Sequence, residues 1–225
     1  MTVAILEQLE ARLGTLPPES VKHDMDSGYD AMADWIRGLS PDERAKLIAV
    51  LPAWLEETHP WHSRAVAELA LRLGNRHLLA ASISVARKVG IHDLAGTTGY
   101  PPWLVFDLSL IAVISRWTDD PGDQARAWLR ELREGMNEES GYPCRLLGIR
   151  AWLTECLLGP PGQRRLCLTK ATELLRTWRD ARLLGSGLSL LHAYFASTPD
   201  GISDLKAVLT PEEFAAACPD ASVPR

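Results

Sequence analysis

The chain has 225 residues, of which 46% are hydrophobic and 24% are charged, a balance typical of a globular protein that is long enough to bury a sizeable core. This composition excludes a disordered or fibrous protein. The formal net charge is −5, but the charges are unevenly distributed. Residues 1–75 carry 7 basic and 12 acidic groups, whereas residues 144–182 carry 8 basic and 3 acidic groups.

The first segment, MTVAILEQLEARLG, has no basic stretch ahead of its apolar residues, so it predicts a helix start and not a signal peptide. The four cysteines form no C-x-x-C pair, which indicates neither a disulfide framework nor a zinc site. The longest apolar run, residues 103–114, is shorter than the ~20 residues that cross a bilayer. We therefore expect a cytoplasmic protein without membrane contact.

Apolar residues recur at helical spacing along the chain, and no stretch alternates as a half-buried strand does. Ser40-Pro41-Asp42-Glu43 and Thr210-Pro211-Glu212-Glu213 each combine a capping box with proline at the first helical position, and Asp120-Pro121 indicates a third helix start. Glycines at 14, 38, 74, 90, 135 and 185 mark helix ends. The predicted helices cover residues 2–13, 27–37, 41–57 with a kink at Pro52, 61–73, 76–89, 102–117, 121–134, 144–158, 163–180, 183–196 and 203–217 in two pieces.

Short connections between these helices favour antiparallel neighbours, in a compact multi-helix bundle or in a stack of helical hairpins. Trp-Leu recurs at 54–55, 103–104, 128–129 and 152–153, a spacing that favours the stack. The stretch LALRLGNRHLLAASISVARKVG, residues 69–90, resembles a helical hairpin of the HEAT or tetratricopeptide type in its small residues and its turn. The resemblance implies a short α-solenoid of about ten antiparallel helices. We predict one all-α domain, 1–225, with a subdivision near residues 96–102 as the alternative.

The segment 102–117 is predicted to be a central helix that is apolar on every side. Asp107 interrupts it, and an ionised carboxylate there is unfavourable unless it is paired or accepts hydrogen bonds. We interpret Asp107 first as a structural residue that interacts with the helix N-terminus or with Arg150. The alternative is a binding residue in a pocket beside Trp103.

The corner Glu56-Glu57-Thr58-His59-Pro60-Trp61-His62 contains one Glu-x-x-His spacing, which holds iron in di-iron bundles when two copies are present. A single copy is found here, and Pro60 disfavours helical geometry at His59. The corner therefore predicts surface histidines, and His59 and His62 are kept as binding candidates. Trp61 and Trp117 join them, because both follow or precede polar residues at helix ends and are predicted to be exposed.

Two further strings contain residue types that bind metal ions. Asp119-Asp120-Pro121-Gly122-Asp123 is similar to the DDxxD motif of terpenoid synthases, but Pro-Gly interrupts it and no second motif follows, so Asp120 predicts a helix cap. His23-Asp24-Met25-Asp26 is interpreted as a loop that ends in caps. Phosphate-binding loops, nucleophile elbows and metalloprotease motifs do not occur in the sequence. We expect no metal, no cofactor and no catalytic residue set.

The basic segment 144–182 raises the alternative of nucleic-acid binding, because α-solenoids with positive grooves, such as helical-repeat DNA glycosylases, hold phosphates. Because the net charge of the chain is negative, we prefer to interpret the basic segment as a helix face exposed to solvent. The candidate basic patch consists of Arg164, Arg165, Lys170, Arg176 and Arg179.

These patterns favour a non-catalytic helical scaffold whose acidic N-terminal half binds another protein. Bacterial immunity proteins, which neutralise basic toxins, are similar in fold class and charge, and the comparison rests on these two properties alone. The alternatives are an enzyme or small-molecule-binding protein with a pocket around residues 102–117, and a nucleic-acid-binding protein.

Overall fold

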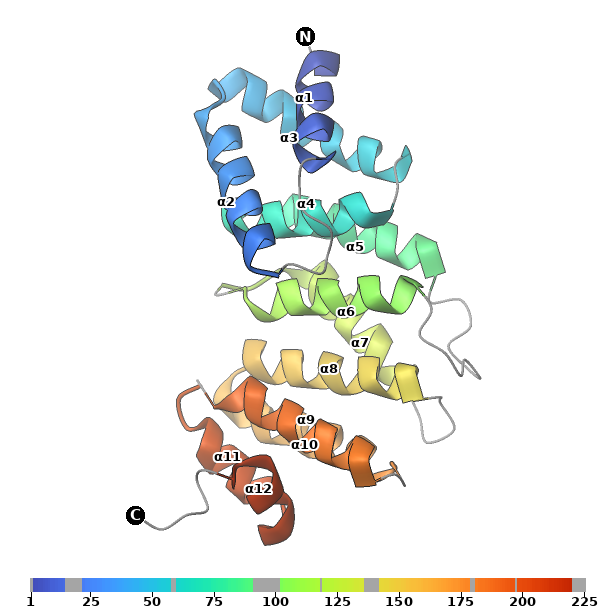
Figure 1. The fold of residues 1–225 in the computed structure, drawn as a ribbon, viewed down its shortest axis with the longest axis vertical. Helices are drawn as coiled ribbons and strands as arrows, with labels where there is room; N and C mark the ends of the chain where they lie inside the picture. Colours follow the sequence, from blue (N-terminus) through green and yellow to red (C-terminus); the bar gives the residue numbers. More distant parts are fainter. Residues whose placement is uncertain are drawn as a thin grey trace. The chain divides into compact units, whose positions relative to one another are not determined.

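The computed structural model describes residues 2–14, 22–57, 60–90, 102–117, 119–135, 142–178, 181–196 and 198–219. Within these ranges twelve helices follow one another without a strand (Figure 1). The helices are α1 (Thr2–Gly14), α2 (Lys22–Gly38), α3 (Pro41–Glu57), α4 (Pro60–Leu73), α5 (Arg76–Gly90), α6 (Pro102–Ser115), α7 (Asp123–Glu134), α8 (Tyr142–Leu158), α9 (Pro161–Arg176), α10 (Ala181–Phe195), α11 (Gly201–Val208) and α12 (Pro211–Ala217). The all-α prediction is confirmed.

The chain divides into two compact units. The N-terminal unit consists of Met1–His92 and Val105–Ala125, and the C-terminal unit of Asp93–Leu104 and Arg126–Arg225. The prediction of a single domain stays a prediction.

In both units a helix packs against the helix two places further along the chain. In the N-terminal unit α1 contacts α3, α2 contacts α4 and α3 contacts α5; in the C-terminal unit α9 contacts α11 and α10 contacts α12. The successive helices α4 and α5, and likewise α8 and α9, lie side by side as hairpins (Figure 1). Contacts of this kind are typical of stacked helical pairs, in agreement with the predicted bundle or solenoid.

The turn between α4 and α5 is set by two adjacent residues. Gly74 has φ of +61°, a left-handed conformation that glycine adopts without steric strain, and the Asn75 N–H donates to the Ala70 carbonyl at 2.8 Å to close α4. The Asn75 side-chain oxygen then accepts from the N–H groups of His77 at 3.1 Å and Leu78 at 3.2 Å, which caps α5. Residues 69–90 therefore form the predicted helical hairpin.

Both predicted capping boxes are confirmed. At the start of α3 the Glu43 N–H donates to Ser40 Oγ at 3.3 Å, and the Ser40 N–H donates to Glu43 Oε2 at 3.1 Å. At the start of α12 the Glu213 N–H donates to Thr210 Oγ1 at 3.2 Å, and the Thr210 N–H donates to Glu213 Oε2 at 2.9 Å. Each box satisfies two backbone donors that a helix N-terminus otherwise leaves open.

Several helix starts differ from the prediction, and two of them, those of α2 and α7, change the interpretation of a predicted motif. Helix α2 begins at Lys22, so His23–Asp26 lies in a helix and not in a loop. Helix α7 begins at Asp123 and not at Pro121. Asp120 Oδ1 accepts the Gly122 N–H at 3.1 Å, and Gly122 has φ of +95°, so this turn has to finish before helical geometry starts.

Each unit has its own apolar interior. The N-terminal unit buries residues of α3, α4 and α5, among them Leu47, Leu51, Leu55, Val66, Leu69, Leu78, Leu79 and Ile83. The C-terminal unit buries a cluster that includes Ile149, Leu153, Cys156, Cys167, Leu168, Ala171, Leu175, Trp178, Leu188, Leu191, Phe195 and Leu205. Trp54, Trp128 and Trp178 are buried, and Trp152 is partly buried against the C-terminal cluster.

Helix α6 is less enclosed than predicted. Leu110, Ile111, Val113 and Ile114 are buried, but Ala112 is exposed and Leu108 is half-buried. The prediction of a helix buried on every side is therefore wrong at this face. Small or apolar residues also occur on protein surfaces, so composition alone does not reveal which side of an apolar helix meets solvent.

Candidate functional site

Asp107 lies on α6 in the N-terminal unit and is 2% exposed. Burial raises the pKa of its carboxyl to about 7, because the surrounding low dielectric penalises the charged form. Asp107 has no hydrogen bond or ion pair with any residue that the structure describes. Its carboxyl therefore changes charge near neutral pH without a described group that compensates for the change.

Arg150, the predicted ionic partner of Asp107, belongs to the C-terminal unit, so that pairing stays a prediction. The side chain of Trp103, the predicted neighbour in a pocket, lies outside the described residues. The raised pKa of Asp107 is the one feature of the predicted pocket that the described residues supply.

The predicted binding corner is described in part. His62 is half-buried and stacks on Trp54, with ring centroids 5.0 Å apart and an interplanar angle of 15°. Trp54 Nε1 donates to Glu10 Oε1 at 2.8 Å, which ties α1 to α3. His59 and the side chain of Trp61 lie outside the described residues. His62 is thus half-buried and contributes a stacking contact at the corner.

Trp117 corrects another prediction. Its side chain is 7% exposed, although its position at a helix end suggested exposure. The Trp117 N–H donates to the Ile114 carbonyl at 3.0 Å, and the Arg116 N–H to the Val113 carbonyl at 3.1 Å. These bonds tighten the chain into a final turn after α6, and the indole ends up in the interior.

The basic patch is largely neutralised by carboxylates within the C-terminal unit. Arg165 Nε donates to Asp204 at 2.9 Å, and Lys170 donates to Glu173 at 2.7 Å. Arg176 makes a bidentate contact with Glu213, at 2.8 and 2.7 Å. This contact raises the pKa of Arg176, and the guanidinium in turn holds the pKa of Glu213 below its usual range.

The remaining members of the patch carry less information. Arg164 is half-buried, and Arg179 lies outside the described residues. Internal pairing leaves few of these cations available for phosphate groups, since a phosphate would have to displace an existing carboxylate.

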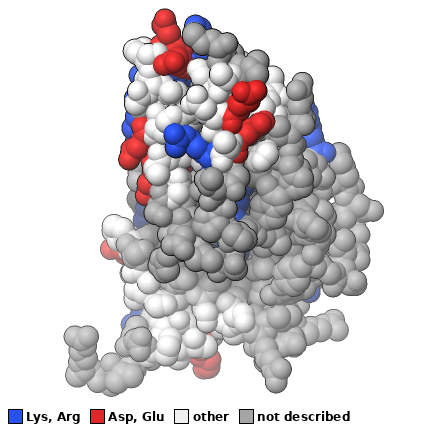
Figure 2. All heavy atoms as spheres, turned by 45° about the horizontal axis from the view of Figure 1, so that its top comes forward, with Lys and Arg blue, Asp and Glu red and all other residues white. Residues whose placement is uncertain are grey.

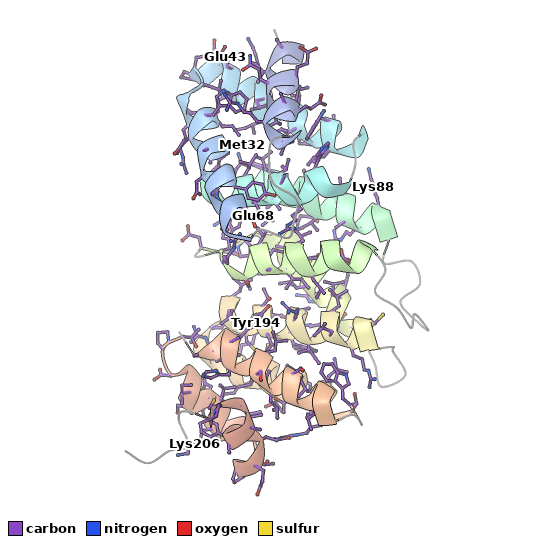
Figure 3. The ribbon with its side chains drawn as sticks, in the orientation of Figure 1. Met32, Glu43, Glu68, Lys88, Tyr194 and Lys206 are labelled. Atoms are coloured by element: carbon purple, nitrogen blue, oxygen red, sulfur yellow. The ribbon has the colours of Figure 1, made fainter. Side chains whose placement is uncertain are left out.

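A charged cluster that the sequence did not single out runs through the N-terminal unit. Glu68 on α4 is 6% exposed and accepts hydrogen bonds from Arg72 Nη1 at 2.5 Å and from Arg116 Nη2. Arg72 Nε also donates to Asp30 on α2 at 2.6 Å. The cluster joins α2, α4 and the residue that follows α6, and Glu68 is labelled in Figure 3. Burial lowers the pKa of Arg72, but the hydrogen bonds to Asp30 and Glu68 outweigh it and raise the pKa.

One part of this cluster has a signal in the sequence. Glu68 and Arg72 are four residues apart on one helix, the spacing at which opposite charges meet. Asp30 and Arg116 are 42 and 48 residues away from their partners, and no local pattern connects them. The arrangement orders three helices, and its internal pairing resembles a structural ion-pair network more than a reactive site.

Among the residues that the structure describes, no group of three or more His, Cys, Asp or Glu side chains could hold a metal ion. In the same ranges, no helix has the length and apolar character that a membrane span requires.

Comparison with protein-family models, with curated proteins and with solved structures finds no match for this chain.

Proposed function

We propose that the chain is a protein-binding scaffold, in which stacked helices present the acidic surface of the N-terminal unit to a basic surface of a partner protein. The observation that carries this proposal is a contrast in charge pairing. Arg165, Lys170 and Arg176 of the basic segment are matched by carboxylates of their own unit. Residues 1–75 carry 12 acidic and 7 basic groups, and complementary charge speeds and selects protein association.

Two exposed carboxylates of the N-terminal unit stand out. Glu7 on α1 and Asp42 in the first turn of α3 are exposed and have no ion-pair partner among the described residues. Figure 2, which looks onto the end that carries α1 in Figure 1, shows Asp and Glu side chains at several places on this face. A partner with lysines or arginines would gain charge contacts here without breaking internal pairs.

The partner class that fits this chemistry best is a basic protein such as a toxin, which a bacterial immunity protein would neutralise. This assignment rests on charge and fold class. It also fits the rigid framework, because stacked helical pairs bind with little ordering of their backbone.

Two helix starts of the chain provide a matched test. Asp42 and Glu212 occupy the same position in the two capping boxes, directly after proline, so Asp42→Lys and Glu212→Lys disturb the helix dipole alike. We expect Asp42→Lys to weaken capture of a partner by the full chain about tenfold, and Glu212→Lys to leave it unchanged. Capture should also weaken as salt rises. Equal effects of both variants, or a monomer that turns over a substrate without any partner, would contradict the proposal.

Asp107 supports a second candidate function, a small-molecule-binding protein with a site at α6. A buried carboxyl with a pKa of about 7 is able to exchange a proton at neutral pH, as binding and catalytic carboxyls do. A ligand-dependent shift of the Asp107 carboxyl resonance, seen by NMR during a screen of small bases, would favour this function over the scaffold.

A further inference from the structure

The C-terminal unit contains two cysteines that meet across a helical hairpin. Cys156 lies three residues before the Gly159 turn on α8, and Cys167 lies on the facing part of α9. Both are buried in the same apolar cluster, and their side chains interact with one another. Neither is in a disulfide. The two cysteines are eleven residues apart in the sequence, and this spacing does not predict a contact. The contact depends on how α8 and α9 pack against each other.

The surroundings of the pair make its two thiols unequal. The contact with Cys156 and the guanidinium of Arg133 lower the pKa of Cys167 to about 7, against the opposing effect of burial. Burial, followed by the contact with Cys167, raises the pKa of Cys156. Cys156 also donates to the Arg164 carbonyl at 3.3 Å. Cys167 is therefore the thiolate-forming member, and thiolates are the reactive form of cysteine.

Arg133 is held in place next to this pair. Its guanidinium stacks over the Trp152 ring, 4.2 Å from the ring centroid, and it forms an ion pair with Glu155. Residues 152, 155 and 156 all lie on α8, so one helix positions both the arginine and the second thiol.

We propose that Cys156 and Cys167 are a redox modification site, which a hydroperoxide converts into a disulfide that links α8 to α9. The Cys167 thiolate attacks one oxygen of the hydroperoxide, the O–O bond breaks, and the leaving oxygen takes up a proton as an alcohol or water. Cys167 is then a sulfenic acid. The Cys156 sulfur attacks the Cys167 sulfur, the S–O bond breaks, and hydroxide leaves as water with the Cys156 proton. Two thiols are oxidised, and one hydroperoxide is reduced.

Oxidation of Cys167 makes the Cys156 thiol easier to deprotonate, which favours its attack in the second step. The negative charge on Cys167 is one cause of the high pKa of Cys156, and that charge disappears when Cys167 becomes a sulfenic acid. Access for the oxidant requires local opening, because both thiols are buried. They lie within two helical turns of the hairpin end at Gly159-Pro160, and such ends open at lower free energy than a whole core.

The test is oxidation of the full wild-type chain with hydrogen peroxide at pH 7, followed by mass spectrometry of peptides without reduction. We expect the loss of two hydrogens per chain, a linked peptide that contains Cys156 and Cys167, and full reversal by dithiothreitol. The double variant Cys144→Ser/Cys218→Ser should retain this product, because burial raises the pKa of Cys218 and neither residue belongs to the pair. Links to Cys144 or Cys218, a disulfide-bonded dimer, or unlinked Cys156 and Cys167 in oxidised protein would overturn the proposal.

Arg133 provides a second, quantitative readout. Arg133→Gln removes the cation beside Cys167, so the oxidation rate at pH 7 should fall about threefold and its pH profile should move to higher pH. Arg133→Lys, which keeps the charge, should stay closer to wild type. An unchanged rate and profile in Arg133→Gln would contradict the assigned order of the two thiols. These measurements need no binding partner, so their outcome is independent of the scaffold proposal.

Discussion

The two units place different chemistry inside similar stacks of helices. The N-terminal unit holds Glu68 between two arginines, so three elements are joined by charge. The C-terminal unit instead packs leucines, aromatic rings and two facing thiols in one apolar cluster, with the Arg133–Glu155 pair beside it. Helical stacking therefore does not require one particular kind of buried contact. The two units should respond differently when a buried charge is removed and when a side chain is enlarged in a packed interior.

The largest expected effect is the loss of the central carboxylate of the N-terminal unit. Glu68→Gln leaves Arg72 and Arg116 without their shared counter-charge, and removal of one member of a buried ion pair costs about 3 kcal/mol of unfolding free energy. Urea unfolding measures the change. The control is Asp34→Asn, which removes an exposed pair with Arg37 and should cost less than about 1 kcal/mol. Similar losses in both variants would argue against a stabilising role of the Glu68 cluster.

The next effect concerns Asp107 and depends on pH. Its folded pKa of about 7 lies above the ordinary value of 3.8, so between these values the folded chain holds a proton that the unfolded chain releases. Stability therefore falls as pH rises from about 4 to about 7 and then levels off. Asp107→Asn should remove this loss and be more stable than wild type at pH 8, by on the order of 2 kcal/mol.

Urea unfolding of the Asp107→Asn variant at pH 5 and pH 8 measures this difference. Asp119→Asn, at an exposed aspartate, should behave as wild type at both pH values. A variant at Asp107 that is less stable than wild type at pH 8 would show that the carboxylate has a stabilising partner.

A smaller effect tests the close packing of the C-terminal unit. A methyl group at Gly187 would lie 2.9 Å from Leu175 Cγ and 3.0 Å from the Trp178 ring, so Gly187→Ala should destabilise the chain by about 1–2 kcal/mol. Gly185 lies on the same helix with no atom within 4 Å of such a methyl group. Gly185→Ala should stabilise by about 0.5–1 kcal/mol through helix propensity. Thermal unfolding of both variants should show shifts of opposite sign.

The smallest effect separates the two capping boxes. The Ser40 hydroxyl and backbone lower the pKa of Glu43, whereas Arg176 is the largest cause of the lowered pKa of Glu213. Arg176→Met should raise the pKa of Glu213 toward its ordinary value and leave Glu43 unchanged, as seen by NMR titration of the side-chain carboxyls. Since both pKa values are lowered, each contribution to stability is present above the ordinary pKa and is lost as pH falls through the folded value. A shift at both glutamates would contradict the separate causes.

Local sequence accounts for most of the helical map. The first and last residues of each described helix lie within two residues of their predicted positions, except the start of α2 and the end of α9. This agreement arises because caps such as Ser40 and Asn75 bond to groups two or three residues away. Asp107 was likewise recognised from its apolar neighbours alone. Such interactions need no tertiary contact, so they can be read directly from the chain.

Local sequence patterns were enough to predict an all-α chain, its capped helix starts and the unusual position of Asp107. The tertiary structure alone decided that Trp117 is buried, that Arg176 is neutralised by Glu213 37 residues away, and that Cys156 meets Cys167. The two groups of features differ in the distance along the chain over which the interactions act. A cap or an apolar stripe acts within one or two turns, but ion pairs and thiol contacts between helices depend on which faces the stacking brings together.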